Sequence, residues 1–181
     1  MWPTEIEWTI EQLNQHLPTD CRTCIDVGSE GEYYRTKRQP WMLGFYGYLA
    51  RRGIHIYTMD FSPGANADYI HDITQEPVGI GTFDLVIATH LLEHVVFEKM
   101  SDVVRNLERL VSNGRYLWVS VPNAYPYHER PIDNGWRPTA EELTNIFHGT
   151  VIVAATFEVE HTLPQYFDKP KNRMSCAMLS Y

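Results

Sequence analysis

The sequence lacks several features that would assign it to whole classes of protein. Only three of its 181 residues are cysteines, too few for a disulfide framework or a four-cysteine zinc site. No run approaches the roughly 20 apolar residues of a membrane span, and the N-terminus lacks a basic region followed by an apolar one. Repeats and low-complexity tracts are absent as well. We therefore expect one soluble, cytoplasmic domain over residues 1–181.

Positive charge is also scarce. Lys and Arg total 15 against 23 Asp and Glu, so the formal net charge is −8. This balance disfavours loose binding to phosphate backbones or anionic lipid surfaces, although it does not rule out specific nucleic-acid contacts. We expect no membrane partner.

Two of the cysteines, Cys21 and Cys24, have the spacing of a redox motif. Cys24 runs straight into an apolar strand, however, and no second pair follows. We interpret both as ordinary core or strand-edge residues.

Apolar runs that end in glycine, proline or acidic residues predict seven strands. The run from Phe83 to Thr89 is continuously apolar after Asp84, as expected for the centre of a parallel sheet covered on both faces. Residues 151–155 could extend a helix instead of opening a strand. The predicted strands are residues 24–28, 54–61, 68–73, 83–89, 116–121, 151–161 and 176–181.

One helix is predicted before the first strand, over residues 4–17, and two between later strands, over residues 91–110 and 139–147. Thr4 with Glu7, and Thr139 with Glu142, have the spacing of capping boxes at two of the helix starts. Strand alternating with helix predicts an α/β fold: a doubly wound, mostly parallel, Rossmann-like seven-stranded sheet with helices on both faces.

Polar residues and a glycine follow the predicted strands at the edge where such sheets bind ligands. Gly28, Asp60, Asp72 and Thr89 should converge there. An acid at the position of Asp60 can accept hydrogen bonds from ribose hydroxyls, and it disfavours a 2′-phosphorylated cofactor. Asp72 could accept a hydrogen bond from an adenine amino group, or simply precede a turn. The loop at Gly28 is by itself equally consistent with a plain tight turn.

Several motifs in this order and spacing resemble the class I S-adenosylmethionine-dependent methyltransferases, particularly the small type with a Leu-Glu-His segment after the fourth strand. The resemblance covers roughly residues 24–147. It rests on residues 25–28, 59–62, 71–73, 83–95 and 119–123.

This resemblance implies S-adenosylmethionine as cofactor. The first loop would hold the methionine moiety, Asp60 the ribose and Asp72 the adenine, while the residues around Thr89 would line the cofactor. The implied cofactor-binding residues are Asp26, Gly28, Ser29, Gly31, Asp60, Phe61, Asp72, Ile73, Thr89, His90 and Leu91. The loop departs from the family pattern, because Glu30 and Glu32 stand where alternate glycines are usual.

Residues 122–138 form a long aromatic loop where an acceptor pocket or lid would lie. It could also be a well-packed surface loop. The candidate acceptor-binding residues are Tyr125, Tyr127, His128, Trp136 and Arg137.

If the acceptor is a hydroxyl group, His90, His94 and His128 are candidate catalytic residues that could take its proton. Glu93 and His94 could instead serve only to tie down the helix. Helical spacing would place His90, Glu93 and His94 on one face, and with His128 they could ligate a divalent metal. That set is similar to the one in ubiquinone-pathway and small-RNA O-methyltransferases. Because His90 replaces their first acid, a metal is possible but not expected.

These observations favour methyl transfer to a small-molecule or carbohydrate-like acceptor, at an oxygen atom. One alternative is a catalytically weak or inactive protein that binds S-adenosylmethionine, which the altered glycine loop would explain. Another is a nucleic-acid or protein methyltransferase, which the acidic charge disfavours. A nicotinamide-dependent dehydrogenase fits least. The first loop lacks the third glycine of the dinucleotide-binding motif, and the sequence has no Tyr-x-x-x-Lys or comparable pair of residues for hydride transfer.

Overall fold

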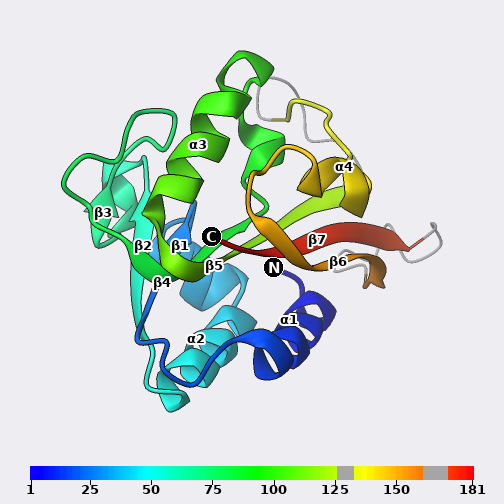
Figure 1. Ribbon diagram of the computed structural model, residues 1–181. Coiled ribbons are helices and arrows are strands. Elements are labelled where there is room, and N and C mark those ends of the chain that lie inside the picture. The colour runs from blue at the N-terminus through cyan, green and yellow to red at the C-terminus, as the bar shows by residue number, and fades with distance from the viewer. Residues whose placement is uncertain (126–132, 161–170) are drawn as a thin grey trace.

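The computed structural model describes residues 1–125, 133–160 and 171–181. These residues form a central seven-stranded sheet between two layers of helices (Figure 1). The strand order is β3-β2-β1-β4-β5-β7-β6. The strands are β1 (Thr23–Val27), β2 (His55–Asp60), β3 (Tyr69–Ile70), β4 (Phe83–Thr89), β5 (Val111–Ala124), β6 (Thr150–Val159) and β7 (Asn172–Ser180).

Strands β1 to β5 pair in parallel, while β7 runs antiparallel to both of its neighbours, β5 and β6. The predicted doubly wound, mostly parallel sheet is therefore confirmed. The chain order reverses at β1 and β4, so the carboxyl ends of these strands border the crevice in which such sheets bind ligands.

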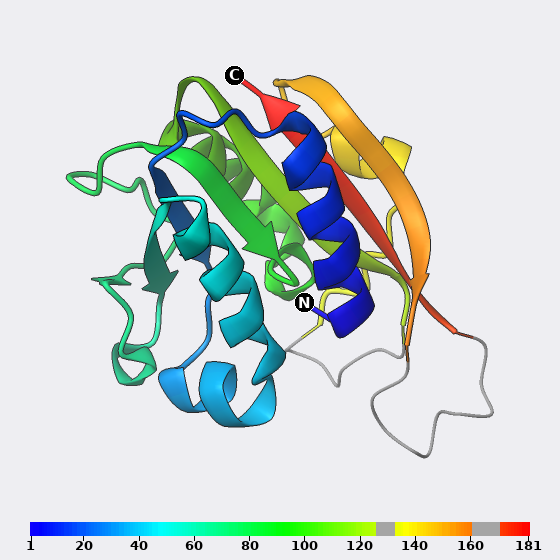
Figure 2. The same cartoon turned by 90° about the horizontal axis from the view of Figure 1, so that it is seen from below.

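Helices cover both faces of the sheet. Figure 2 shows α1 (Pro3–His16) and α2 (Trp41–Arg51) on one face, with α3 (Met100–Leu110) and α4 (Ala140–Thr144) on the other. Side chains of β4 alternate between the two layers: Leu85 and Ile87 join the α1 and α2 cluster, whereas Val86 and Ala88 join the α3 and α4 cluster. This double burial explains the continuous apolar run of β4.

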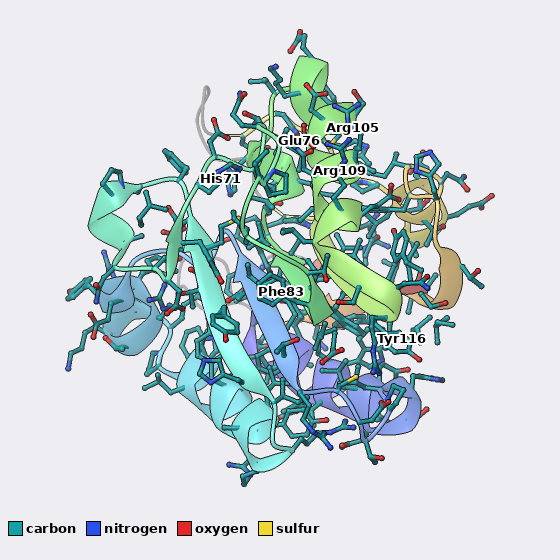
Figure 3. The ribbon with its side chains drawn as sticks, turned by 60° about the vertical axis from the view of Figure 1, so that its left-hand side comes forward. His71, Glu76, Phe83, Arg105, Arg109 and Tyr116 are labelled. Carbon is teal, nitrogen blue, oxygen red and sulfur yellow. The ribbon has the colours of Figure 1, made fainter. Side chains whose placement is uncertain are left out.

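The connection between β3 and β4 is held against α3. Asn106 of α3 donates hydrogen bonds to the carbonyl oxygens of Ile73 and Gln75, at 2.8 and 2.9 Å. Arg109 pairs with Glu76 at 2.8 Å (Figure 3). These contacts fix the segment that follows Asp72 beside the sheet.

The first helix begins earlier than its sequence indicates, so the predicted capping pair of Thr4 and Glu7 is wrong. Pro3 occupies the first helical position, which its fixed φ angle suits. Trp2 caps the helix, and its amide donates to Glu5 Oε2 at 2.8 Å. The Thr4 amide instead donates to Glu160 Oε1 at 3.1 Å.

The predicted helix over residues 91–110 is wrong in its first half. Only α3 is α-helical, and two short 3₁₀ turns, Leu92–His94 and Phe97–Lys99, precede it. The Asn134 side chain donates to the carbonyl oxygens of Leu92 and Val95, at 2.8 and 2.6 Å. These bonds attach the segment before α3 to the chain at Asn134.

Other boundaries also differ from the prediction. Strand β3 ends at Ile70 and not at Ile73, and β7 begins at Asn172 and not at Cys176. Strand β5 is longer, and Pro122 does not close it but lies within it, opposite Met174. Helix α4 ends at Thr144, although its predicted capping box of Thr139 and Glu142 is confirmed by reciprocal bonds of 2.8 and 3.2 Å. The helical alternative for residues 151–155 is wrong, because they belong to β6.

The three cysteines are buried free thiols, as the interpretation of Cys21 and Cys24 expected. Within the described ranges, no helix is long and apolar enough to cross a membrane.

Candidate active site

The first loop of the site turns sharply after β1. Gly28 has a φ of +75°, a left-handed conformation that glycine adopts without strain. Its amide donates to the Met59 carbonyl oxygen at 2.9 Å, which ties the end of β1 to the end of β2. A Cβ atom on Gly28 would lie only 2.9 Å from Leu91 Cδ1. The structure thus brings Gly28 and Leu91 into direct proximity.

Asp60 ends β2 with its carboxylate held by the backbone. Oδ2 accepts from the Glu30 amide at 3.1 Å and Oδ1 from the Ser62 amide at 2.9 Å. A carboxylate oxygen can accept more than one hydrogen bond, so each retains capacity for a ligand hydroxyl. The next residue, Phe61, leaves 74% of its surface exposed. A carboxylate beside an exposed aromatic ring suits a nucleoside, because one can bind ribose and the other can stack on the base.

The altered glycine loop makes its turn with Glu30 in place of a glycine. Glu30 has a φ of +62°, which is unusual for a residue with a side chain. The buried guanidinium of Arg35 donates to Ser29 Oγ at 3.0 Å and to the Glu30 carbonyl oxygen. Arg35 and Asp60 together therefore hold the loop in a conformation that its own residues disfavour.

The other predicted cofactor residues are not all at the surface. Asp26 is buried in β1, where its carboxylate accepts from the Tyr46 hydroxyl at 2.5 Å. Burial raises the pKa of Asp26, and the bond from Tyr46 opposes that rise. Ile73 is buried in the core, whereas Asp72 is exposed and accepts from the Thr74 amide at 2.9 Å. Thr89 is buried at the end of β4.

Gly31 lies next to Ala65. A Cβ atom added to Gly31 would be 3.8 Å from the Ala65 Cα atom, an ordinary van der Waals distance. This contact places the end of the first loop beside the turn that follows β2. The first loop, Asp60 and Leu91 consequently form one continuous candidate cofactor site.

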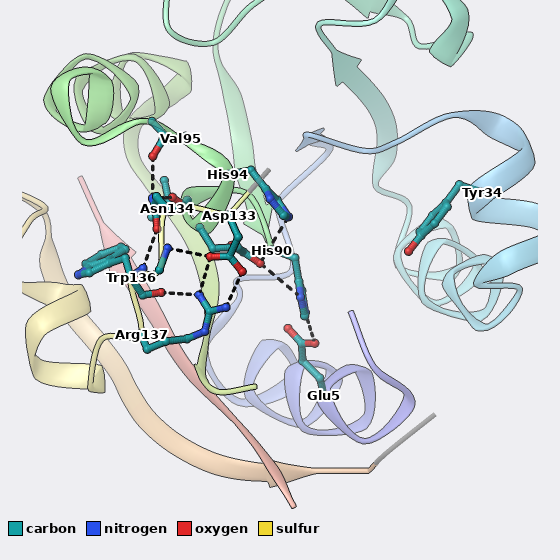
Figure 4. Close-up of polar contacts among 12 residues, drawn as sticks. Glu5, Tyr34, His90, His94, Val95, Asp133, Asn134, Trp136 and Arg137 are labelled. Atoms are coloured by element: carbon teal, nitrogen blue, oxygen red, sulfur yellow. Dashed lines mark hydrogen bonds and ion pairs between the residues drawn. The ribbon is translucent and has the colours of Figure 1, made fainter. Parts of the chain in front are cut away.

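A buried acid–imidazole pair lies at the end of β4. Nε2 of His90 is 2.8 Å from Oε2 of Glu5, a fully buried residue of α1 (Figure 4). Glu5 Oε1 also accepts from the Ser120 hydroxyl at 2.5 Å. His90 keeps 24% of its side chain exposed and has a φ of +54°. Three elements, α1, β4 and β5, thereby position one imidazole.

The charge state of Glu5 determines which nitrogen of His90 carries hydrogen. Burial alone would raise the pKa of Glu5, but the nearby positive charge of His90 and of the N-terminal amine, with the hydrogen bonds from His90 and Ser120, lowers it to about 2. An ionised carboxylate only accepts, so Nε2 must donate. Burial also lowers the pKa of His90, which favours a neutral ring with a lone pair on Nδ1.

A second buried acid, Glu93, faces the other side of His90. Glu93 Oε1 is 3.7 Å from His90 Nδ1 and 3.9 Å from His94 Nε2. Its Oε2 atom is buried without a hydrogen-bond partner in the part of the chain that the structure describes. Burial raises the pKa of Glu93 to about 8, although its own backbone and Arg137 oppose the rise.

The predicted grouping of His90, Glu93 and His94 thus occurs, but through a 3₁₀ turn and not on one face of an α-helix. Over residues 1–125, 133–160 and 171–181, no group of three or more His, Cys, Asp or Glu is arranged to hold a metal ion. His128, the proposed fourth ligand and a candidate catalytic residue, lies outside the described residues.

The predicted acceptor residues fall into four groups. Tyr125 is half-buried and its ring centroid lies 5.5 Å from that of Trp2, which in turn lies 6.2 Å from that of His90. Arg137 pairs with Asp133 through bonds of 3.1 and 2.6 Å (Figure 4). Trp136 packs against the α3 and α4 core. Tyr127 and His128 lie outside the described residues.

Sequence reasoning missed Glu5, Trp2 and Arg35 as site residues. One signal for Glu5 was available: Glu5, Thr9 and Leu13 recur every four residues and form the buried stripe of α1. Arg35 stands in no motif, and only the path of the loop reveals its role.

Several solved structures share this fold, methyltransferases among them. TehB from Haemophilus influenzae has a TM-score of 0.64 at 14% identity, over 96% of this chain and 61% of its own chain. A methyltransferase from Methanosarcina mazei has a TM-score of 0.63 at 13% identity, over 93% and 96%. The 1,6-didemethyltoxoflavin-N1-methyltransferase of Burkholderia thailandensis, solved with S-adenosylhomocysteine, has a TM-score of 0.67 at 13% identity, over 97% and 77%. The fold is that of the class I S-adenosylmethionine-dependent methyltransferases.

The sequence also matches a family model described as a methyltransferase domain, over residues 22–168. No curated protein matches it. The chain belongs to this methyltransferase family, whose cofactor is S-adenosylmethionine, so the resemblance and the enzyme class predicted from the motifs are confirmed.

Proposed function

We propose that this methyltransferase acts on a hydroxyl oxygen of a small-molecule or carbohydrate-like acceptor, with His90 as the base. The observation that carries the proposal is the 2.8 Å contact between His90 and the buried, ionised Glu5 at the carboxyl end of β4. Such a pair is needed for a protonated acceptor, because methyl transfer to a nucleophile that is already deprotonated requires no base.

The first loop, Asp60 and Leu91 are the residues that would hold the cofactor. Asp60 retains acceptor capacity for hydroxyl groups, and Leu91 packs against Gly28 at the turn of the first loop. When bound, S-adenosylmethionine supplies a methyl group already activated by the positive charge on its sulfur. The chain's own residues have only to position the acceptor and remove its proton.

Glu5 gives His90 two properties of a general base. It holds the ring with Nε2–H toward the protein, so the lone pair of Nδ1 is available to accept a proton. It also supplies a negative charge that stabilises the imidazolium once the proton has moved. Buried acids commonly orient catalytic imidazoles in this way.

The aromatic residues and the charge support a small acceptor. Trp2 and Tyr125, both half-buried near His90, offer ring surfaces of the kind that pack against sugar rings or flat small molecules. The net charge of −8 disfavours nucleic acid. The Burkholderia enzyme of the same fold was solved with a small molecule, 1,6-didemethyltoxoflavin.

The test is transfer of a tritiated methyl group from S-adenosylmethionine to a panel of hydroxylated, amino-substituted and macromolecular acceptors. We expect label on an oxygen, with His90→Gln lowering turnover by about 10²-fold or more. His148→Gln, at an exposed histidine, is the matched control and should leave turnover unchanged. Label appearing only on nitrogen, or full turnover by His90→Gln, would refute His90 as the base.

The main alternative is a catalytically weak or inactive cofactor-binding protein. Glu30 and Glu32 favour this alternative. They stand where the family usually has glycine, and their side chains restrict the backbone conformations open to the first loop. Tight binding of S-adenosylhomocysteine without transfer to any acceptor would support this alternative. Label on RNA or protein would support the other, a nucleic-acid or protein methyltransferase.

A further inference from the structure

Glu93 is a buried acid with no role in the proposed function, in which Glu5 alone orients His90. Only 3% of its side chain is exposed, and Oε2 has no hydrogen-bond partner within the described ranges. A buried polar atom without a partner is costly, typically by about 1–3 kcal/mol, so its retention points to a function.

The other charged and polar groups around Glu93 are engaged with different partners. Arg137 directs both terminal nitrogens of its guanidinium at Asp133, at 3.1 and 2.6 Å. Asn134 donates its backbone amide to the Glu93 carbonyl oxygen and not to the carboxyl group. Glu5, from α1, is bound to His90 and Ser120. Among the described residues, the side chains within ion-pair distance of the Glu93 carboxyl group are two imidazoles.

A single oxygen of Glu93 lies between those imidazoles. Oε1 is 3.7 Å from Nδ1 of His90 and 3.9 Å from Nε2 of His94. The His90 side chain is 24% exposed, that of Glu93 3% and that of His94 35%, so the buried carboxyl group of Glu93 links two partly exposed imidazoles. Both gaps exceed a hydrogen bond, and catalytic hydrogen bonds are often long in the free enzyme and tighten in the complex with substrate.

We propose that Glu93 is a proton-relay residue: its carboxyl group takes the acceptor's proton from Nδ1 of His90 and passes a proton to Nε2 of His94. The acceptor's O–H bond breaks as the Nδ1–H bond forms, and that proton then moves to Oε1 as Nδ1 regains its lone pair. The carboxylic acid next gives a proton to His94, which releases it to water. One proton enters and one leaves, and no further reactant is needed.

Two features make Glu93 suited to this step. A pKa raised to about 8 by burial keeps both its protonated and ionised forms accessible near neutral pH. It also lies between His90 and His94 on its own segment, with the charged groups Glu5, Asp133 and Arg137 around it, so the proton passes between protein groups until His94 releases it to water. The relay rests on the proposed function, because it assumes that His90 is the base.

The test needs no acceptor. Nitrogen-15 NMR of the full chain, labelled at histidine, reports the tautomer of His90, and relaxation dispersion near its pKa reports how fast its ring gains and loses a proton. We expect Glu93→Gln and His94→Asn each to slow that exchange about tenfold, because neither replacement carries the proton onward. Glu98→Gln, at an exposed acid in the following turn, is the matched control and should change nothing.

The outcomes separate the relay from the base. If His90 keeps its Nε2–H tautomer but exchanges as fast in both variants as in the wild type, the relay is wrong and the base stands. A His90 ring with hydrogen on Nδ1 would instead overturn the proposed function. Should Glu93→Gln fail to fold, His94→Asn alone decides the relay, because His94 is partly exposed at the surface.

Discussion

At the scale of single residues, Asp60 combines two tasks. Its carboxylate orders the first loop through the Glu30 and Ser62 amides, and it retains capacity for ligand hydroxyls. Asp60→Ala should therefore weaken binding of S-adenosylhomocysteine by roughly 1.5–3 kcal/mol, the usual worth of hydrogen bonds to a charged group. Isothermal titration calorimetry measures the loss. Affinity equal to that of the wild type would contradict the assigned position of the ribose.

Glu93 should make stability depend on pH in a direction opposite to that of most acids. Its pKa is about 8 in the folded chain against 4.5 as the reference value. Between these values the folded chain holds a proton that the unfolded chain has lost, so the free energy of unfolding falls as pH rises, by at most about 1.4 kcal/mol per pH unit.

Urea unfolding of the wild type and of Glu93→Gln at pH 5, 6.5 and 8 tests this expectation. The difference between the two curves isolates Glu93 from other titrating groups such as His90. We expect the free energy of unfolding of Glu93→Gln to rise steadily relative to that of the wild type as pH rises. The free energy of unfolding of Glu98→Gln should follow that of the wild type. A constant difference would mean that Glu93 is ionised throughout.

At the scale of elements, the turn after β1 depends on one glycine. Gly28→Ala places a side chain at a φ of +75° and within 2.9 Å of Leu91. We expect a loss of about 1–2 kcal/mol in the free energy of unfolding, the cost of a left-handed backbone for an L-residue, together with weaker cofactor binding.

Gly44→Ala is the matched control for that substitution. Gly44 lies in α2, where an added methyl group would meet no atom within 4 Å, so alanine there should stabilise the helix by up to about 1 kcal/mol. Thermal and urea unfolding of the two variants should change in opposite directions. Equal effects of the two substitutions would show that the turn at Gly28 does not require glycine.

At the scale of the whole molecule, the site is assembled from α1 and from the ends of several strands of one sheet, so it exists only in the folded chain. A ligand that binds only the folded chain stabilises all of it, by about 2.7 kcal/mol at 100 times its dissociation constant. S-adenosylhomocysteine should accordingly raise the unfolding temperature, and NAD should not. No shift at millimolar S-adenosylhomocysteine would mean that Glu30 and Glu32 have closed the site.

The chain's strands and its cofactor-side motifs could be predicted because they are encoded locally. The run Phe83–Thr89 is apolar since both faces of β4 are covered, and its boundaries are as predicted. Gly28 and Asp60 stand directly at strand ends, where topology alone brings them together. Helix capping could be predicted at Thr139 for the same reason, as its partner Glu142 lies only three residues away.

The acceptor side was decided by contacts between remote segments. Glu5 meets His90 across 85 residues, and Asn134 binds the carbonyl oxygen of Leu92 across 42 residues. Arg35 holds the first loop by donating a hydrogen bond to Ser29, and no sequence motif predicts this contact. The sequence by itself determined the class of enzyme and its cofactor edge, because those signals are short-range and periodic. Only tertiary structure decided which imidazole has a buried acid behind it, since that pairing depends on where α1 packs.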